Sequence, residues 1–389
     1  MFQRYRLAEI AKIKSGKRLP AGCDFSTEVT AHPYIRARDI KNGKLLSNDL
    51  AYISDETHRK IQRYIISEGD VAITIVANIG DVGFCDKRLS GANLTENAVR
   101  LTDFTNAADG RYLSYYLSQP FMKQYMELLA AGAAQAKLGI YKIEKIAISL
   151  PPLPTQRKIA KVLSAYDDLI ENNTKRIRIL ERMAEELYKE WFVRFRFPGH
   201  EKAKFVNGLP EGWRKGALKE ICEFKRGNNI TSAEMIAGDI PVISAGLGLS
   251  GFHNRANVSG VSITMSSSGA NAGYIAIHYS DIWAADCSYV SSTNTKNIYY
   301  AYELLNNLRV TITNYQMGSA QPHVYPRDVN RIKLIVPSLD IVGKANNILA
   351  KIHGEIDCYQ RQNALLARQR DLLLPRLMSG KLSVEGVVE

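Results

Sequence analysis

Few side chains in this sequence stand at spacings that would support a chemical reaction. Gly246, Gly248 and Gly251 match the Gly-x-Gly-x-x-Gly pattern of dinucleotide-binding loops, but the segment that follows, residues 252–257, is typical of a turn. A dinucleotide site needs a helix that begins within the motif, so that the helix N-terminus faces the pyrophosphate. These glycines therefore indicate an ordinary glycine-rich loop.

The sequence also lacks the motifs that would support metal binding, nucleotide hydrolysis or nuclease activity. None of the seven histidines stands at metal-ligand spacing from a cysteine or a carboxylate. No Gly-Lys dipeptide has the upstream glycine and the following hydroxyl residue of a phosphate-binding loop. The fragment Glu223-Phe224-Lys225 lacks an aspartate one strand earlier. We therefore expect no catalytic residue, no metal site and no cofactor site in this chain.

The strongest pattern is an internal duplication, in which residues 5–163 align with residues 213–349. A repeat of this length is too long for a solenoid unit and has the right size for a duplicated domain. Two copies of one module imply two copies of one task. The matching segments include Leu7-Ala8-Glu9-Ile10 and Leu218-Lys219-Glu220-Ile221, Lys14-Ser15-Gly16 and Lys225-Arg226-Gly227, and the Gly-x-Ala-Gln segments Gly132-Ala133-Ala134-Gln135 and Gly318-Ser319-Ala320-Gln321.

Composition and charge indicate what kind of partner the two modules bind and where the protein acts. The 389 residues include 51 Lys and Arg against 39 Asp and Glu, which gives a formal net charge of +12. This excess favours a polyanionic partner. The 46% of hydrophobic residues is ordinary for a soluble globular chain. Five dispersed cysteines without a Cys-x-x-Cys motif indicate reduced thiols, and no apolar leader or stretch of about eighteen uncharged apolar residues occurs. We therefore expect a cytoplasmic protein without a membrane partner.

Two long segments have helical rather than strand-like periodicity. Apolar residues recur at helical spacing from Thr155 to about Trp191, with Asn173 at an otherwise apolar seam position, and from Ile341 to about Met378. Two such helices can bury their apolar faces against each other as an antiparallel pair. In the alternative, each helix packs on its own module.

The remaining segments suggest where the modules begin and end. We expect a first module over residues 1–150, a central helix over 151–196, a linker over 197–212, a second module over 213–336, and a C-terminal helix and tail over 337–389. The linker prediction rests on two prolines and several glycines with little apolar periodicity.

The order of these segments resembles the specificity subunit of type I restriction-modification systems over essentially the whole chain. The resemblance lies in a Pro-Pro-Leu-Pro-Thr-Gln-Arg-Lys-Ile-Ala segment at residues 151–160, Trp191-Phe192 at the end of the first helix, and Leu-Pro-Glu-Gly-Trp at residues 209–213. The second helix ends in a matching Leu-Pro-Arg-Leu-Met segment at residues 374–378, but it lacks the Pro-x-x-x-Gln entry of the first.

The resemblance implies an α+β fold with two similar mixed α/β target recognition domains, separated by two long helices packed as an antiparallel coiled coil. It implies a non-catalytic subunit in which each domain reads one half of a bipartite, asymmetric site on double-stranded DNA. Two methyltransferase subunits would dock on the long helices, and restriction and translocase subunits would join the complex. S-adenosylmethionine, ATP and Mg²⁺ would belong to those partners.

The DNA-contacting residues are expected among loop side chains that bond to base edges, because Arg and Lys recognise guanine and Asn and Gln recognise adenine. A self-contained restriction or modification enzyme and a coiled-coil protein without a DNA role remain as alternatives. The candidates are Lys14, Lys17, Arg18, Arg36, Arg38, Asn78 and Gln135 in the first module, and Lys225, Arg226, Asn228, Ser267, Asn271, Tyr274, Gln321 and His323 in the second.

Overall fold

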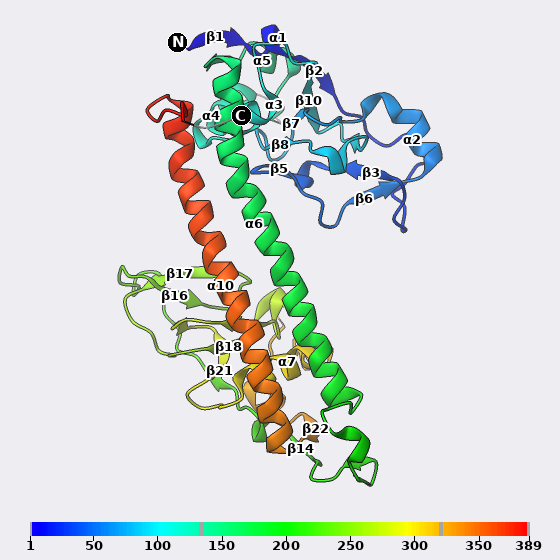
Figure 1. Cartoon of the computed structure of the whole chain (residues 1–389), viewed down its shortest axis with the longest axis vertical. Coiled ribbons are helices and arrows are strands. Elements are labelled where there is room, and N and C mark those ends of the chain that lie inside the picture. Colours follow the sequence, from blue (N-terminus) through cyan, green and yellow to red (C-terminus); the bar gives the residue numbers. More distant parts are fainter. Residues whose placement is uncertain (1, 132–135, 319–321, 387–389) are drawn as a thin grey trace. The chain divides into compact units, whose positions relative to one another are not determined.

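A computed structural model of the chain describes residues 2–131, 136–318 and 322–386. The chain packs into two compact units, each assembled from segments that are far apart in the sequence. The first unit comprises Met1–Ile170 and Leu365–Glu389, and the second comprises Glu171–Ala364. Each of the two long helices therefore gives one part to each unit (Figure 1).

The first unit contains a six-stranded sheet in the order β2-β10-β7-β8-β5-β4, a three-stranded sheet β6-β3-β9 and the pair β1-β11. Its strands are β1 (Gln3–Arg6), β2 (Lys12–Ser15), β3 (His32–Ile35), β4 (Ile40–Lys41), β5 (Gly43–Leu45), β6 (Ala51–Ile53), β7 (Val71–Thr74), β8 (Val82–Phe84), β9 (Asn93–Leu94), β10 (Ala98–Thr102) and β11 (Ala147–Leu150). Its short helices are α1 (Leu7–Ile10), α2 (Asp55–Ile61), α3 (Gly110–Leu117), α4 (Pro120–Ala130) and α5 (Ile140–Glu144).

The second unit contains a four-stranded sheet in the order β15-β21-β18-β19, a three-stranded sheet β17-β16-β20 and the pairs β14-β22 and β12-β13. Its strands are β12 (Phe205–Val206), β13 (Leu209–Pro210), β14 (Arg214–Ala217), β15 (Lys225–Arg226), β16 (Ile240–Ile243), β17 (Leu249–His253), β18 (Ser262–Ser266), β19 (Ile275–His278), β20 (Trp283–Ala284), β21 (Cys287–Ser291) and β22 (Lys333–Val336). Its short helices are α7 (Ile298–Asn307), α8 (Arg309–Thr313) and α9 (Pro326–Val329).

The two units repeat one topology. The sheet order β2-β10-β7-β8 corresponds to β15-β21-β18-β19, and the pair β1-β11 corresponds to β14-β22. In the small sheets, β3 pairs in parallel with β9 as β16 does with β20. The first unit adds β5 and β4 at the edge of its main sheet. The duplication read from the sequence is therefore a duplication of the fold.

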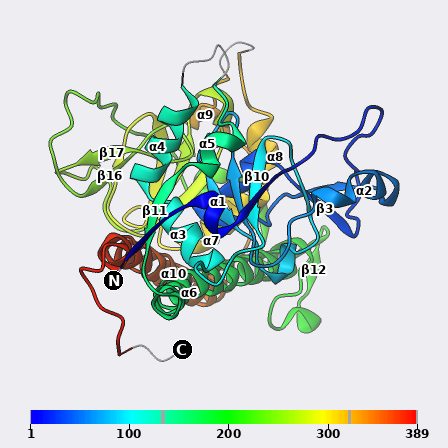
Figure 2. The same ribbon diagram turned by 90° about the horizontal axis from the view of Figure 1, so that it is seen from above.

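The long helices are α6 (Leu153–Tyr188) and α10 (Leu339–Met378). Within the second unit, Asn173 on α6 donates a 3.4 Å hydrogen bond to Gln362, and Arg176 donates a 3.1 Å bond to Tyr359. Residue numbers rise on one helix as they fall on the other, so the helices run antiparallel there. Figure 2 shows the two helices side by side, seen from above. Asn173 is only 5% exposed, in agreement with its predicted seam position.

Both long helices contribute to the hydrophobic core of each unit. In the first unit, Ile159 and Leu163 of α6 and Leu377 of α10 are buried with the side chains of the main sheet. In the second unit, Tyr188 of α6 and Leu349 of α10 are buried with α7 and the four-stranded sheet. The expected antiparallel helix pair is confirmed. The alternative, in which each helix packs only on its own module, does not describe either helix.

Near the N-terminal end of each long helix, a polar side chain forms hydrogen bonds with the backbone at the start of a short helix. The side chain differs between the two long helices. The buried Gln156 on α6 accepts a 3.0 Å hydrogen bond from the backbone N–H of Asp109, which precedes α3, and donates to the carbonyl oxygen of Ala107. On α10, the amide oxygen of Asn346 accepts from the backbone N–H groups of Tyr299 and Tyr300 in the first turn of α7. The missing glutamine of the second entry is thus offset by an asparagine about two turns inside the helix.

A buried carboxylate fastens the helices to the first unit. Asp167 on α6 is 5% exposed and accepts hydrogen bonds from the Tyr115 hydroxyl of α3 and, at 2.6 Å, from Arg370 of α10. The Lys44 ammonium of β5 lies 3.0 Å from the same carboxylate. Burial acts to raise the pKa of Asp167, but these donors hold the pKa below its ordinary value. One ionised side chain therefore joins four elements.

The second unit is fastened by a buried histidine. His353 on α10 is 2% exposed, and its Nε2 lies 3.1 Å from a carboxylate oxygen of the buried Glu303 on α7. The Nδ1 atom of His353 lies 2.8 Å from the Tyr279 hydroxyl that follows β19, and the ring stacks on Tyr299. Polar side chains are buried here only because each has a partner.

We predict that Asp167→Asn lowers the free energy of unfolding by about 2 kcal/mol or more, because the buried amide can no longer form charge-assisted bonds with the partly exposed Lys44 and Arg370. The measurement is urea denaturation of the purified chain. Asp371→Asn is the matched control: Asp371 pairs with the same Arg370 at 2.8 Å but is 63% exposed, so its loss should cost less than about 1 kcal/mol. Equal losses in the two variants would contradict the anchoring role of Asp167.

Candidate nucleic-acid interface

The glycines of the duplicated Lys-x-Gly segments mark a close approach of two backbone segments. A Cβ atom on Gly16 would lie 2.0 Å from the carbonyl oxygen of Thr95, and one on Gly227 would lie 2.5 Å from that of Ala284. Only glycine fits at such a distance. After β2 and after β15, the chain therefore passes directly over the link that enters β10 or β21.

Each of these links carries a carboxylate that binds an arginine. In the first unit, Arg18 Nε donates a 2.8 Å hydrogen bond to Glu96, and in the second, Arg226 Nη2 donates a 2.8 Å bond to Asp286. We call these two ion pairs the corner pairs. Their arginine side chains are 80% and 47% exposed, and both carboxylate side chains are 30% exposed. The corner pairs are therefore accessible from solvent.

The carboxyl group of Glu96 is held in its ionised form. Partial burial acts to raise its pKa, but the hydrogen bonds from Arg18 and Thr95 and the positive charge of Arg18 hold the pKa below its ordinary value. The pKa of Arg18 is raised by the same hydrogen bond. The pair thus presents a fixed anion beside a fixed cation at neutral pH.

A hollow of about 500 Å³ opens beside the first corner pair. Lys17 and Glu96 line it together with Lys137, Tyr64 and Tyr141. The Lys17 ammonium lies 5.8 Å from the centre of the Tyr64 ring, and the Tyr141 side chain is 60% exposed. Cations next to exposed aromatic rings are typical of nucleic-acid surfaces, where they bind phosphates and bases.

The residues that follow the first Gly-x-Ala-Gln segment return to this hollow. Lys137 forms a bridge with Val76 at the end of β7, and the backbone N–H of Leu138 donates to the carbonyl oxygen of Ile75 at 3.0 Å. In the second unit, Gly269 donates to Pro322 at 2.9 Å and Val324 donates to Ser267 at 3.1 Å. Both repeated segments are therefore flanked by residues that are bound to the turn after β7 or β18.

The second corner pair extends into this turn. Ser268 donates a 2.8 Å hydrogen bond to Asp286, and the half-exposed Tyr274 lies beneath the Arg309 guanidinium at 5.8 Å. A recess of about 170 Å³ nearby is lined by Tyr274 and His278 and by the glycine-rich loop. Burial lowers the pKa of His278 to about 4, so this histidine is neutral at physiological pH.

Several predicted residues of the first unit already have anionic partners. Lys14 lies 3.2 Å from Asp103, Arg36 binds the buried Asp39 at 2.9 Å, and Arg38 binds Asp49 at 2.7 Å. Arg36 is also only partly exposed. Asn78 lies exposed in the turn between β7 and β8. The DNA roles of these residues stay predictions.

The predicted residues of the second unit differ in accessibility. Lys225 and Asn228 are exposed, and Asn271 and His323 are partly exposed. Ser267 is fully buried, and its hydroxyl has no hydrogen-bond partner among the described residues. Gln135 and Gln321 lie outside the described residues, so their predicted roles stay predictions.

The sequence interpretation missed the anions and most of the aromatic rings of these surfaces. Glu96 and Asp286 were not candidates, because carboxylates are disfavoured beside phosphates. Tyr64 and Tyr141 were not candidates either, since both are distant in sequence from Lys17 and Glu96. The available signal was the pair of Lys-x-Gly segments, whose glycines mark the links that carry the two carboxylates.

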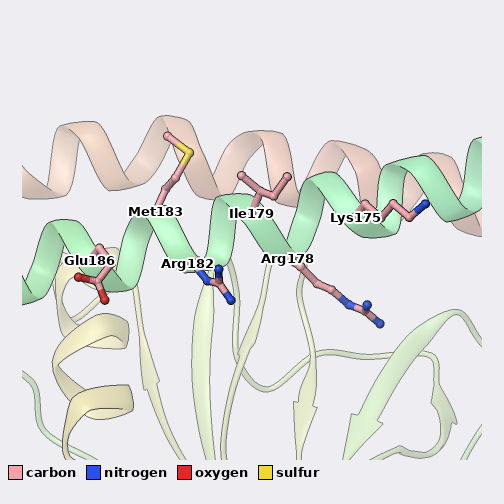
Figure 3. A pocket seen from close by; sticks show the side chains of 6 residues that line it. All are labelled: Lys175, Arg178, Ile179, Arg182, Met183 and Glu186. Carbon is pink, nitrogen blue, oxygen red and sulfur yellow. The ribbon is translucent and has the colours of Figure 1, made fainter. Parts of the chain in front are cut away.

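A separate exposed surface lies on α6 within the second unit. Ile179 and Met183 are 60% and 53% exposed and project from one side of the helix, whereas Arg178 and Arg182 project from another (Figure 3). Lys175 and Glu186 complete the surface. We call these six residues the α6 surface. Exposed apolar side chains with a charged rim are typical of protein contact sites.

The glycine-rich motif has no phosphate-binding helix behind it, since it leads into strand β17. Among the described residues, no group of three or more His, Cys, Asp or Glu side chains is placed to hold a metal ion. In the part of the chain that the structure describes, no helix is long and apolar enough to span a membrane.

Comparison with known proteins identifies the class. The family model of the type I restriction modification DNA specificity domain matches residues 1–182 and 210–367. The chain is 26% identical over 410 residues to the type I restriction enzyme MjaIX specificity subunit of Methanocaldococcus jannaschii, covering 97% of this chain and 94% of that protein. It is 19% identical to the HindI specificity subunit of Haemophilus influenzae, with 90% and 94% covered.

The fold agrees with that class. The crystal structure of the type I restriction-modification S subunit from Mycoplasma genitalium superimposes with a TM-score of 0.64, at 20% identity, over 97% of this chain and 96% of that one. The chain belongs to the type I restriction-modification DNA specificity family. It is a non-catalytic DNA-recognition subunit, and the comparisons lend no support to a self-contained enzyme.

Proposed function

We propose that each unit reads one half of a bipartite, asymmetric site on double-stranded DNA. The observation that carries this proposal is the repeated topology with unlike surfaces. Both units place a corner pair in or just after the first strand of the main sheet, but the surroundings differ: lysines and tyrosines in the first unit, and serines, Tyr274 and His278 in the second. A shared frame with different loop side chains is suited to reading two different sequences.

The contact surface of each unit includes its corner pair and the loops beside it. Lys17, Lys137 and Arg309 are the cations best placed to bind phosphates, and the exposed tyrosines offer faces for packing against sugar or base. The net charge of +12 favours DNA association in general. Residues on either side of the predicted Gln135 and Gln321 segments reach the same turns.

The long helices would set the spacing between the half-sites. Helix α6 has 36 residues and α10 has 40, which corresponds to rods of about 54 and 60 Å at 1.5 Å per residue. Each helix contributes residues to both cores, so a change in its length is expected to change the spacing that the chain imposes. Two readers on one face of B-DNA are expected about one helical turn apart.

The helices would also bind two methyltransferase subunits, and the α6 surface is the proposed contact. It offers two adjacent apolar side chains between cations, so it fits an apolar partner surface with acidic residues at its rim. The restriction and translocase subunits would join through that complex. S-adenosylmethionine, ATP and Mg²⁺ would be bound by those partners, and the assembly would act in the cytoplasm on cellular DNA.

Exchanging one unit should change one half-site only. We predict that replacing residues 1–150 with the same span of a relative changes one half of the methylated sequence, because base contacts lie within each unit. The measurement is the methylome of cells that express the chain with its methyltransferase subunit. Replacement of residues 213–336 is the reciprocal variant and should change the other half. If both halves changed together, the units would not read independently.

Lengthening both helices should lengthen the spacer. We predict that seven residues inserted after Ile170 and again after Ala364 add about 10.5 Å and nearly two full turns to each helix. The methylated site should keep both half-sequences and gain about three base pairs between them, at 3.4 Å per base pair. The matched control is the same insertion after Glu201, outside both helices. An unchanged spacer in the helix variant would contradict the proposal that the helices set the distance between the half-sites.

A charge on the α6 surface should weaken methyltransferase binding. We predict that Met183→Glu lowers the amount of methyltransferase subunit that copurifies with the tagged chain by tenfold or more, on the order of the 1.4 kcal/mol lost when one interface anchor is removed. Val29→Glu is the control, because Val29 is 79% exposed and lies away from both helices in the sequence. If the Met183→Glu chain copurified with as much methyltransferase subunit as the wild-type chain, the α6 surface would not be the contact.

A further inference from the structure

The two units keep an arginine and a carboxylate at the same corner although the residues around them have diverged. Arg18 lies two residues after Gly16, whereas Arg226 lies one residue before Gly227. Glu96 is separated from β10 by one residue, whereas Asp286 directly precedes β21. The positions differ, but the 2.8 Å ion pair is the same. The two units therefore share the ion pair as well as the Lys-x-Gly segment, although the arginine and the carboxylate occupy different positions in each.

Stability does not account for this pair. Ion pairs between side chains as exposed as Arg18 and Arg226 contribute little to folding, because solvent screens them. A carboxylate also repels the phosphates that the nearby cations would bind. The carboxylate at each corner is therefore suited to a DNA contact that requires a negatively charged group.

The edge of a base in the major groove offers a contact of this kind. In the major groove, cytosine presents its N4 amino group as a donor, and a Glu or Asp side chain accepts from it; guanine presents O6 and N7, to which arginine donates. A carboxylate beside an arginine is thus complementary to the two edges of a single C·G base pair. Lysines alone have no acceptor and would not provide this.

Both corner pairs have hydrogen-bonding capacity left for such a contact. Among the described residues, the Arg18 guanidinium donates to Glu96 only through Nε, which leaves its two terminal amino groups for another acceptor. Arg226 donates through Nη2, which leaves Nε and Nη1. Each carboxylate oxygen accepts two hydrogen bonds, and neither Glu96 nor Asp286 is filled by the donors around it.

We propose that each corner pair reads one C·G base pair in the major groove of its half-site. Glu96 or Asp286 accepts from the cytosine N4 amino group, and Arg18 or Arg226 donates to the guanine of the same pair. The ion pair orients both side chains before DNA arrives, so that neither must be ordered on binding. This inference rests on the proposed function, in which each unit reads one half-site.

The first test is Glu96→Gln in the full chain, expressed with its methyltransferase and read out as a methylome. The wild-type site should contain a fixed C·G pair in each half. In the variant, the preference for that pair over the other three should fall by about 5- to 100-fold at one position of one half-site, since the amide is uncharged and can also turn its NH2 donor toward other bases. Asp286→Asn should do the same in the other half. Glu56→Gln is the control, because Glu56 is an exposed carboxylate paired with Lys60 at 2.7 Å on α2.

The second test changes the DNA and uses the variant only for comparison. The wild-type chain, in complex with its methyltransferase, is bound to DNA in which the read cytosine is replaced by pyrimidin-2-one, which lacks the N4 amino group. Affinity should fall by about 5- to 100-fold with the wild-type chain and change little further with Glu96→Gln. Unchanged affinity, or a bipartite site without a C·G pair in each half, would overturn the inference while leaving the two-unit function intact. Simultaneous changes in both half-sites on exchange of one unit would instead overturn that function.

Discussion

The structure depends on how the two long helices are held. An amphipathic helix of 36 or 40 residues is stabilised mainly by packing of its apolar face, and here that packing is divided between two cores. In the first unit the buried Asp167 joins α6 to α3, β5 and α10. In the second, the buried His353 joins α10 to α7 and to the segment after β19. Each unit is complete only when parts of both helices are in place.

This constraint explains how the surface loops of the two units can differ without loss of the fold. The corner pairs and the hollows beside them lie on the sheets, whereas the residues that fasten the helices are a separate buried set. Loop side chains such as Tyr64 or Ser268 can therefore change without disturbing Asp167 or His353. The glycines at positions 16 and 227 cannot change in the same way, because the backbone opposite leaves no room for a Cβ atom.

The sequence predicted the large features because they are periodic or repeated. The duplication, both helices and the seam position of Asn173 could be read from residue spacing alone. The corner pairs could not, since Arg18 and Glu96 are 78 residues apart and Arg226 and Asp286 are 60 apart. Such contacts depend on strand order. Arg36 is a different case: its partner Asp39 is an i,i+3 neighbour, but the sequence did not show that Asp39 is buried and binds it.

The account holds that one chain makes two separate sequence-reading contacts with DNA. Its most direct test is hydroxyl-radical footprinting of the assembled subunit and methyltransferase complex on its own site and on DNA with one half-site scrambled. The account predicts two protected segments about one helical turn apart, with protection weakened over the scrambled half and retained over the other. A single continuous footprint, or one that vanishes as a whole when either half is scrambled, would contradict it.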